Sequence, residues 1–206
     1  MTVRIAVFID WMNIYKAART AFGLEQESGA RGQIDPLQAA RVMAAANKRG
    51  KAAELVRVEI HRGRPLSNQD PVGHRAATLQ AQAWKALDPK VVEPQLRPLR
   101  LNPDSQKLEE KGVDVALAAC AVEWAAIENV DHVIIFSHDT DLSSVVEVIA
   151  RLKGPQAVET ASWVSEEYRR RIPPIEGVTN HSLREKLFLA IEDTENYGRR
   201  ARRASP

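Results

Sequence analysis

The feature that most constrains this chain is a short apolar run at residues 133–136, Val-Ile-Ile-Phe, followed at once by Ser-His-Asp-Thr-Asp. A run of β-branched and aromatic residues of this length is typical of a strand that is buried on both faces. The next segment, Leu142 to Leu152, has the apolar spacing of an amphipathic helix. Asp139 and Asp141 are therefore predicted at a strand-to-helix turn, the place where open α/β sheets bind ligands.

Strand and helix patterns alternate along most of the chain. Val3 to Ile9 is almost wholly apolar and predicts a central strand ending on Asp10, and the apolar spacing from Trp11 predicts a helix that Gly23 ends. Further strands are predicted at Ala53–Ile60 and Ala157–Ala161, and further helices at Ala76–Leu87 and Gly112–Trp124. This alternation predicts an α/β fold with a doubly wound, mostly parallel sheet.

The remaining regions are predicted as loops and a C-terminal extension. His61 to Pro65 is predicted as a basic loop, and Ser182 to Ile191 as a final helix. The last ten residues carry four arginines and almost nothing apolar, so a basic disordered tail is expected at 197–206. The predicted organisation is one domain at 1–162, an extension at 163–196 whose helix packs on that domain, and the tail.

Composition excludes several classes of protein. With 206 residues and 44% hydrophobic content, the chain is long enough to bury one sizeable core. Cys120 is its one cysteine, which excludes an intramolecular disulfide and fits a reducing compartment. The apolar run at 3–9 is too short to span a membrane, so a cytoplasmic protein without a membrane partner is expected. The 29 Lys+Arg nearly balance the 27 Asp+Glu, so only the local distribution of charge indicates partners.

Four aspartates are predicted to converge at one edge of the sheet. Asp10 ends a strand, Asp139 and Asp141 follow the central strand, and Asp114 lies in the first turns of a helix expected to pack on the sheet. Two like charges about 4 Å apart repel by roughly 4 kcal/mol at an effective dielectric constant near 20, so such a cluster takes up protons or binds a cation. Carboxylate oxygens select Mg²⁺ or Mn²⁺, which suits phosphodiester hydrolysis. Asn13 is placed to position an aspartate or a phosphate.

Three segments carry a family resemblance: V-F-I-D-W-M-N-I-Y at 7–15, K-G-V-D-V-A-L-A at 111–118 and I-F-S-H-D-T-D-L at 135–142. In this order and spacing they resemble the NYN domain of the PIN-like nuclease superfamily, in its LabA-like group. The resemblance covers roughly residues 3–162 and implies a Rossmann-like three-layer fold, a catalytic domain at 1–162, and an Mg²⁺- or Mn²⁺-dependent ribonuclease that acts on RNA. It implies that Asp10, Asp114, Asp139 and Asp141 are metal ligands and that these four and Asn13 are catalytic.

Two departures from the family pattern bear on the site. Cys120 stands where many members have an acid, six residues after Asp114, and His138 stands where most have glycine. A thiol is a poor ligand for Mg²⁺, so loss of that acid weakens a second metal site. Basic segments around Arg62, Arg75 and Arg169–Arg171 are candidates for phosphate contacts. The residues expected to contact RNA are Trp11, Ser137, His138, Arg62 and Arg64, with Trp11 stacking on a base.

Each residue taken alone also has a simpler role. An Asp at position 10, 139 or 141 could cap a helix, and Asp114 could favour the helix dipole, but these roles do not explain all four acids together. Trp11 could equally cover the core, and Cys120 could be a small buried residue.

Two other functions stay open from the sequence. A non-catalytic RNA-binding or regulatory module would keep the fold with a degenerate metal site, and Cys120 favours that alternative. A phosphohydrolase using Asp10 as a covalent nucleophile would be expected to have a second acid two residues later, where this chain has Met12. A homo-oligomer is compatible with each of these functions.

Overall fold

The structure, a computed structural model, describes residues 2–46, 52–105, 107–126 and 130–203. Its strands are β1 (Val3–Asp10), β2 (Ala53–Arg64), β3 (Val92–Pro98), β4 (Arg100–Leu101), β5 (Leu108–Glu109), β6 (His132–Phe136), β7 (Val158–Trp163) and β8 (Thr179–Leu183). Its helices are α1 (Trp11–Ala21), α2 (Pro36–Ala45), α3 (Pro71–Leu87), α4 (Val113–Ala126), α5 (Ser143–Lys153), α6 (Glu185–Ile191) and α7 (Tyr197–Arg203), with 3₁₀ turns η1 (Thr140–Leu142) and η2 (Pro155–Ala157).

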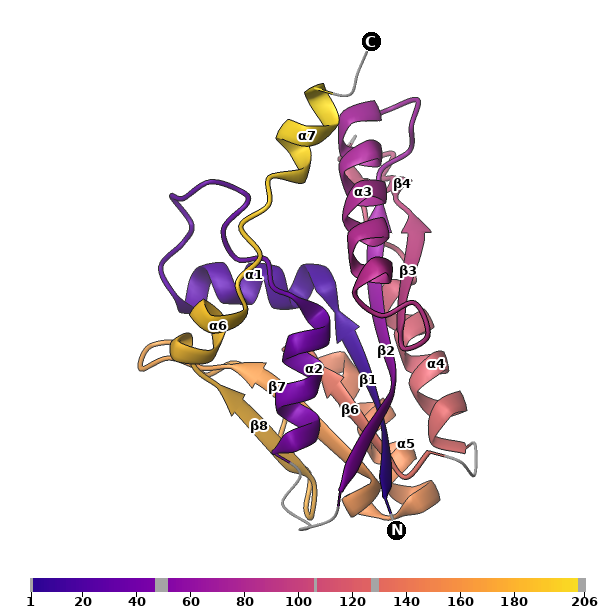
Figure 1. The fold of residues 1–206 in the computed structure, drawn as a ribbon. Coiled ribbons are helices and arrows are strands. Elements are labelled where there is room, and N and C mark those ends of the chain that lie inside the picture. Colours follow the sequence, from indigo (N-terminus) through magenta and orange to yellow (C-terminus); the bar gives the residue numbers. More distant parts are fainter. Residues whose placement is uncertain (1, 47–51, 106, 127–129, 204–206) are drawn as a thin grey trace.

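Six of the strands form one sheet in the order β3-β2-β1-β6-β7-β8, and each neighbouring pair is parallel. β4 and β5 form a separate antiparallel pair. β1 lies between β2 and β6, so Ile9 pairs with both Ile60 and Phe136. Because these strands run in one direction, their carboxyl ends meet at one edge of the sheet (Figure 1). The predicted α/β fold with a mostly parallel sheet is confirmed.

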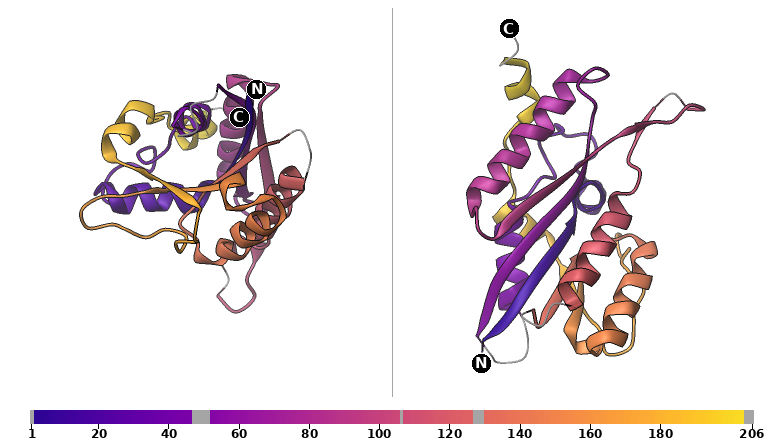
Figure 2. Two further views of the ribbon diagram at one scale, coloured as in Figure 1. Left: turned by 90° about the horizontal axis from the view of Figure 1, so that it is seen from below. Right: turned by 90° about the vertical axis from the view of Figure 1, so that its right-hand side faces the viewer.

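Helices cover both faces of the sheet and give three layers (Figure 2). α1, α2, α3 and α6 pack on one face, where Val7 and Ile9 of β1 join the larger apolar cluster. α4 and α5 pack on the other face against Ala6 and Phe8. Successive side chains of a strand point to opposite faces. Asp10 therefore belongs to the face that α4 covers.

The basic segment after Ile60 is a strand, and its prediction as a loop was wrong. β2 continues to Arg64, and residues 61–64 pair in register with residues 95–98 of β3. The polar side chains suggested a surface loop, but pairing with β3 satisfies the backbone here and packing buries His61 to 1% exposure.

The segment after β7 adds a strand and two helices to the fold. Ser182 and Leu183 belong to β8, which pairs with β7, so the helix predicted from Ser182 begins only at Glu185. Residues 197–203 form α7 instead of the expected disordered tail, because Tyr197 and Ala201 make a small buried stripe on a helix of arginines, which are good helix formers. Residues 204–206 of that predicted tail lie outside the described residues.

α7 packs along α3, where the guanidinium of Arg75 donates to the carbonyl of Ala201 at 3.1 Å. The Tyr197 hydroxyl donates to Oδ2 of Asp193 at 2.9 Å, which fixes the start of the helix. Across the described ranges, no helix combines the length and apolar character that crossing a membrane requires.

Candidate active site

Asp10 lies where β1 ends and α1 begins, and both of its carboxylate oxygens accept hydrogen bonds. Oδ1 accepts from the backbone N–H of Asn13 at 3.4 Å and so caps α1. Oδ2 accepts from the hydroxyl of Ser137, which follows β6, at 2.8 Å. The Asp10 residue is only 3% exposed. These bonds fix the orientation of the carboxylate at the carboxyl edge of the sheet.

The turn after β6 is held by the same polar groups. Oγ of Ser137 accepts from the N–H of Asp139 at 3.0 Å, and the side-chain carbonyl of Asn13 accepts from the N–H of His138 at 2.8 Å. Asp139 caps η1, where its Oδ1 accepts from the N–H of Asp141 at 2.9 Å. Ser137 is fully buried, so it positions the two neighbouring acids instead of making the expected RNA contact.

Three of the four predicted metal ligands come together. One carboxylate oxygen from each of Asp10, Asp114 and Asp139 lies within 4.8 Å of the other two, and we call these three residues the acid cluster. Asp114 is an exposed residue in the first turn of α4, so the cluster is open to solvent. Asp141 lies outside this group and is exposed, but its charge acts on Asp114.

Burial and like charge disfavour the ionised acids of the cluster. Burial raises the pKa of Asp10 to about 7, and the charge of Asp114 adds to the rise while the hydrogen bond from Ser137 opposes it. The pKa of Asp114 is also raised, first by its partial removal from water and then by the charges of Asp139 and Asp141. The neighbouring protein groups therefore leave negative charge uncompensated, which a proton or a cation would offset.

The residues present fit a hard divalent cation. The acid cluster offers only carboxylate oxygens, which are the ligands that Mg²⁺ and Mn²⁺ prefer. The oxygens are close to one another, their uncompensated charge favours a cation, and Asp114 keeps the site accessible. Asp10, Asp114 and Asp139 could therefore hold the cation that the family resemblance implies.

Glu110 is a further acid close to the cluster, and the sequence reasoning missed it. Its Oε1 accepts from the N–H of Gly63 at 2.6 Å and ties the segment before α4 to β2. Its charge contributes to the raised pKa of Asp10. The pKa of Glu110 is itself raised, first by partial removal of the carboxyl group from water. The one signal in the sequence is its place four residues before Asp114, beside Glu109, in a stretch typical of solvent-exposed charge.

Two residues expected to contact RNA turn into the protein instead. Trp11 is 2% exposed and its ring packs on Trp84 with centroids 4.3 Å apart, so it covers the core and presents no face to a base. Arg62 donates to the side-chain carbonyl of Gln80 on α3, and burial lowers its pKa to about 10. Arg64 is the last residue of β2, two positions beyond Arg62.

His138 also serves the fold more than a substrate. Its Nε2 accepts from the backbone N–H of Trp163 at 2.9 Å. Burial lowers the pKa of His138 to about 4, so the ring is uncharged at neutral pH. With its acceptor nitrogen occupied, the ring links the turn after β6 to the end of β7, and the expected phosphate contact is not supported.

An open groove of about 590 Å³ adjoins Asp139 and Asn13. Its basic lining residues are Lys16 of α1 and Arg169–Arg171 of the segment after β7, and we call these four residues the basic groove. All four are exposed. The sequence identified Arg169–Arg171 as a basic segment but gave no reason to place it beside Asp139, since the two are neighbours only in the folded chain.

Comparison with known proteins supports the assignment of the fold. A structure of a protein of unknown function from Vibrio parahaemolyticus has a TM-score of 0.55 and 21% sequence identity, over 89% of this chain and 94% of that chain. At this identity the likeness concerns the fold alone. No curated protein matches the chain significantly. The family model of the NYN domain matches residues 4–154, which include β1, α4 and β6. Since that match spans most of the chain and all three segments that carry the acid cluster, the protein belongs to the NYN domain family, whose members are generally nucleases.

Proposed function

We propose that this protein is a ribonuclease that uses Mg²⁺ or Mn²⁺ to hydrolyse phosphodiester bonds in RNA. The observation that carries the proposal is the convergence of Asp10, Asp114 and Asp139 within 4.8 Å at the carboxyl edge of the sheet. Membership of the NYN domain family supports nuclease chemistry. The basic groove beside Asp139 supports a polyanionic substrate.

In this proposal the acid cluster holds the cation, and Asp141 adds negative charge beside it. Bound there, a divalent cation supplies Lewis-acid activation of water and offsets charge on the phosphate. Ser137 keeps Asp10 and Asp139 at a fixed separation, because its hydroxyl bonds the side chain of one and the backbone of the other. Asn13 is a positioning residue, since it holds the turn that presents Asp139.

The basic groove would hold the RNA backbone. Exposed Lys and Arg side chains contact phosphates without reading bases, so they provide affinity and register more than sequence specificity. The groove is also lined by Asp139, so an RNA strand lying in it would bring a phosphate to the acid cluster.

The proposal is tested with purified wild type and the Asp139→Asn variant on single-stranded and structured RNA, in Mn²⁺, Mg²⁺ or chelator. We expect cleavage only with metal, and cleavage slower by on the order of 100- to 1000-fold in the variant. Glu147→Gln is the matched control, because Glu147 is an exposed carboxylate on α5 outside the acid cluster. Equal cleavage by wild type and Asp139→Asn would contradict the proposal.

A non-catalytic RNA-binding module is the second candidate function. The observation that favours it is Cys120, which lies with Glu59 and His61 instead of adding a carboxylate to the acid cluster. For such a module, RNA binding would persist in chelator and no cleavage would be detected with either metal.

A further inference from the structure

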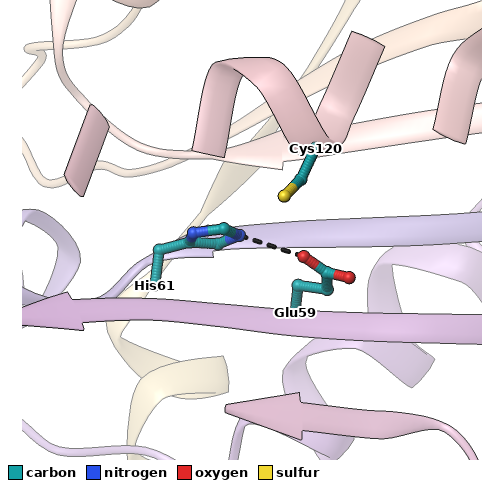
Figure 3. Close-up of side chains that lie close together, drawn as sticks. All are labelled: Glu59, His61 and Cys120. Carbon is teal, nitrogen blue, oxygen red and sulfur yellow. Dashed lines mark hydrogen bonds and ion pairs between the residues drawn. The ribbon is translucent and has the colours of Figure 1, made fainter. Parts of the chain in front are cut away.

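A second group of metal-ligating side chains lies on the face of the sheet that α4 covers. Glu59 and His61 come from β2 and Cys120 comes from α4, and Figure 3 shows the three side chains turned toward one another. We call them the thiol cluster. The surrounding contact between sheet and helix is apolar, with Phe8 and Leu117 in the same cluster of buried residues. Three chemically different donors therefore meet inside an otherwise apolar interface.

The spacing of the three donors is close to that of a metal centre. One ligand atom of each residue lies within 4.8 Å of the other two, and Nε2 of His61 is 3.2 Å from Oε2 of Glu59. Tetrahedral zinc with bonds of about 2.0–2.3 Å separates its ligand atoms by roughly 3.3–3.8 Å. Small rotations of the Glu59 and Cys120 side chains would bring the three atoms to these distances.

The surroundings orient the donors toward one point. Arg57 holds Oε1 of Glu59 through its Nε and Nη2, each at 2.9 Å, which leaves Oε2 facing His61. The Arg57 guanidinium in turn lies over the ring of Trp124, 5.3 Å from its centroid. Glu59 and His61 are 2% and 1% exposed, whereas Cys120 is half-buried, so an ion would reach the cluster from the side of the helix.

We propose that Glu59, His61 and Cys120 form a zinc-binding site. Carboxylate, imidazole and thiolate are the three ligand types that zinc accepts in proteins, and water would complete a set of four. On binding, the sulfur of Cys120 loses its proton to solvent and forms a bond to zinc, with no change of oxidation state. Mg²⁺ is a poor competitor here, because thiolate and imidazole are unfavourable ligands for a hard cation.

The zinc site is distinct from the acid cluster although the two share elements. Cys120 follows Asp114 by six positions, which is about 9 Å along α4 at 1.5 Å per residue. His61 is in register with Asp10 on the neighbouring strand. Zinc would fasten α4 to β2 and so hold the helix that presents Asp114. Zinc binding requires no nuclease activity and therefore stands independently of the proposed function.

The experiment uses the full chain with cobalt as a spectroscopic substitute for zinc. We expect one cobalt ion per chain with a thiolate-to-cobalt charge-transfer band, which zinc abolishes by displacement and excess Mg²⁺ does not. Because Cys120 is the one cysteine, the band reports on this residue and is lost in Cys120→Ser. His61→Asn should weaken cobalt binding by on the order of 100-fold, at least the loss that follows removal of an outer-shell partner. Asp139→Asn is the matched control and should keep the band.

Two results would overturn the zinc site. One is cobalt binding without a thiolate band, which would place the metal elsewhere. The other is a band of unchanged affinity in folded His61→Asn, which would make Cys120 an isolated ligand. If that variant does not fold, alkylation of wild-type Cys120 by iodoacetamide decides, because zinc must slow the reaction and an unchanged rate would refute the site.

Discussion

The acid cluster and the thiol cluster share two neighbouring strands and a helix, yet their donors suit different cations. Asp10 and His61 are paired residues of β1 and β2, and Asp114 and Cys120 both belong to α4. At the sheet edge the donors are all oxygens, and their charge is uncompensated. Inside the interface, Arg57 compensates Glu59, and nitrogen and sulfur join the donors. The backbone thus provides adjoining places for ligands, and the side chains at each place determine hard or soft character.

The largest expected effect separates the two clusters by a single substitution. Asp114→Asn removes one carboxylate oxygen ligand from the acid cluster, so RNA cleavage should fall on the order of 1000-fold. The thiolate-to-cobalt band should persist, because Cys120 and its partners are unchanged. Single-turnover cleavage and cobalt spectra are measured on the same preparation, and loss of both signals would show that the clusters are not independent.

The second prediction concerns the stability of the metal-free protein. In chelator, burial holds the pKa of Asp10 near 7, compared with its ordinary value of 3.8. Between these values the folded chain keeps a proton that the unfolded chain has lost, so the free energy of unfolding falls as pH rises from about 4 toward 7. Asp10→Asn removes the charge and can still cap α1. We expect it to stabilise the chelated protein at pH 8 by about 2–4 kcal/mol, from roughly 1.4 kcal/mol per pKa unit.

Urea denaturation at pH 5 and pH 8 measures this effect, and the difference between wild type and Asp10→Asn should be smaller at pH 5. Added Mn²⁺ should stabilise wild type and have little effect on the variant, because the variant has lost a ligand. A variant less stable than wild type at pH 8 in chelator would show that the Asp10 charge is not a net cost to the fold.

The third prediction assigns the basic groove to the acid cluster alone. Replacing Arg169, Arg170 and Arg171 together by serine should raise the KM for RNA about tenfold. It should also lower the salt dependence of binding by about 0.7 per lost phosphate contact on single-stranded RNA. Cobalt binding should not change. The control replaces three exposed arginines of α7, Arg199, Arg200 and Arg203, and an equal effect there would mean that RNA is held by general positive charge.

The smallest expected effect tests where the acid cluster ends. Glu110→Gln removes a charge near Asp10 but keeps an acceptor for the N–H of Gly63. A partly exposed charge of this kind contributes about 0.2–1 kcal/mol, so the Mn²⁺ concentration for half-maximal cleavage should change only about two- to fivefold. A loss as large as that of Asp114→Asn would identify Glu110 as a ligand.

The acid cluster was largely predictable from the sequence, because Asp10 and Asp139 directly follow apolar strands whose ends meet in a parallel sheet. The thiol cluster was not. His61 was predicted in a loop, so its register beside Asp10 could not be derived, and Cys120 looked like a small residue on an apolar helix. Bringing them together depends on the length of β2 and on the rotation of α4, which local patterns do not determine.

The other differences share one cause, which is packing between segments far apart in the chain. α7 has a buried stripe of only two residues, Tyr197 and Ala201, and its helix is stabilised by contact with α3. Ser137 and Arg62 carry polar groups typical of binding sites, but their partners are Asp10 and Gln80. Composition predicts that such groups need partners, and only the fold identifies them.

The order of the central strands bears on when this protein acquires activity during its own synthesis. Asp10 and Ser137 are 127 positions apart, and the hydrogen bond between them joins β1 to the turn after β6. Contacts across so long a stretch form slowly and need both segments to have left the ribosome. β1, β2 and β3 can pair earlier, while the acid cluster still lacks Asp139. A nascent chain of this enzyme would therefore be unable to cut RNA, its own messenger included, until the second carboxylate-bearing turn has been translated.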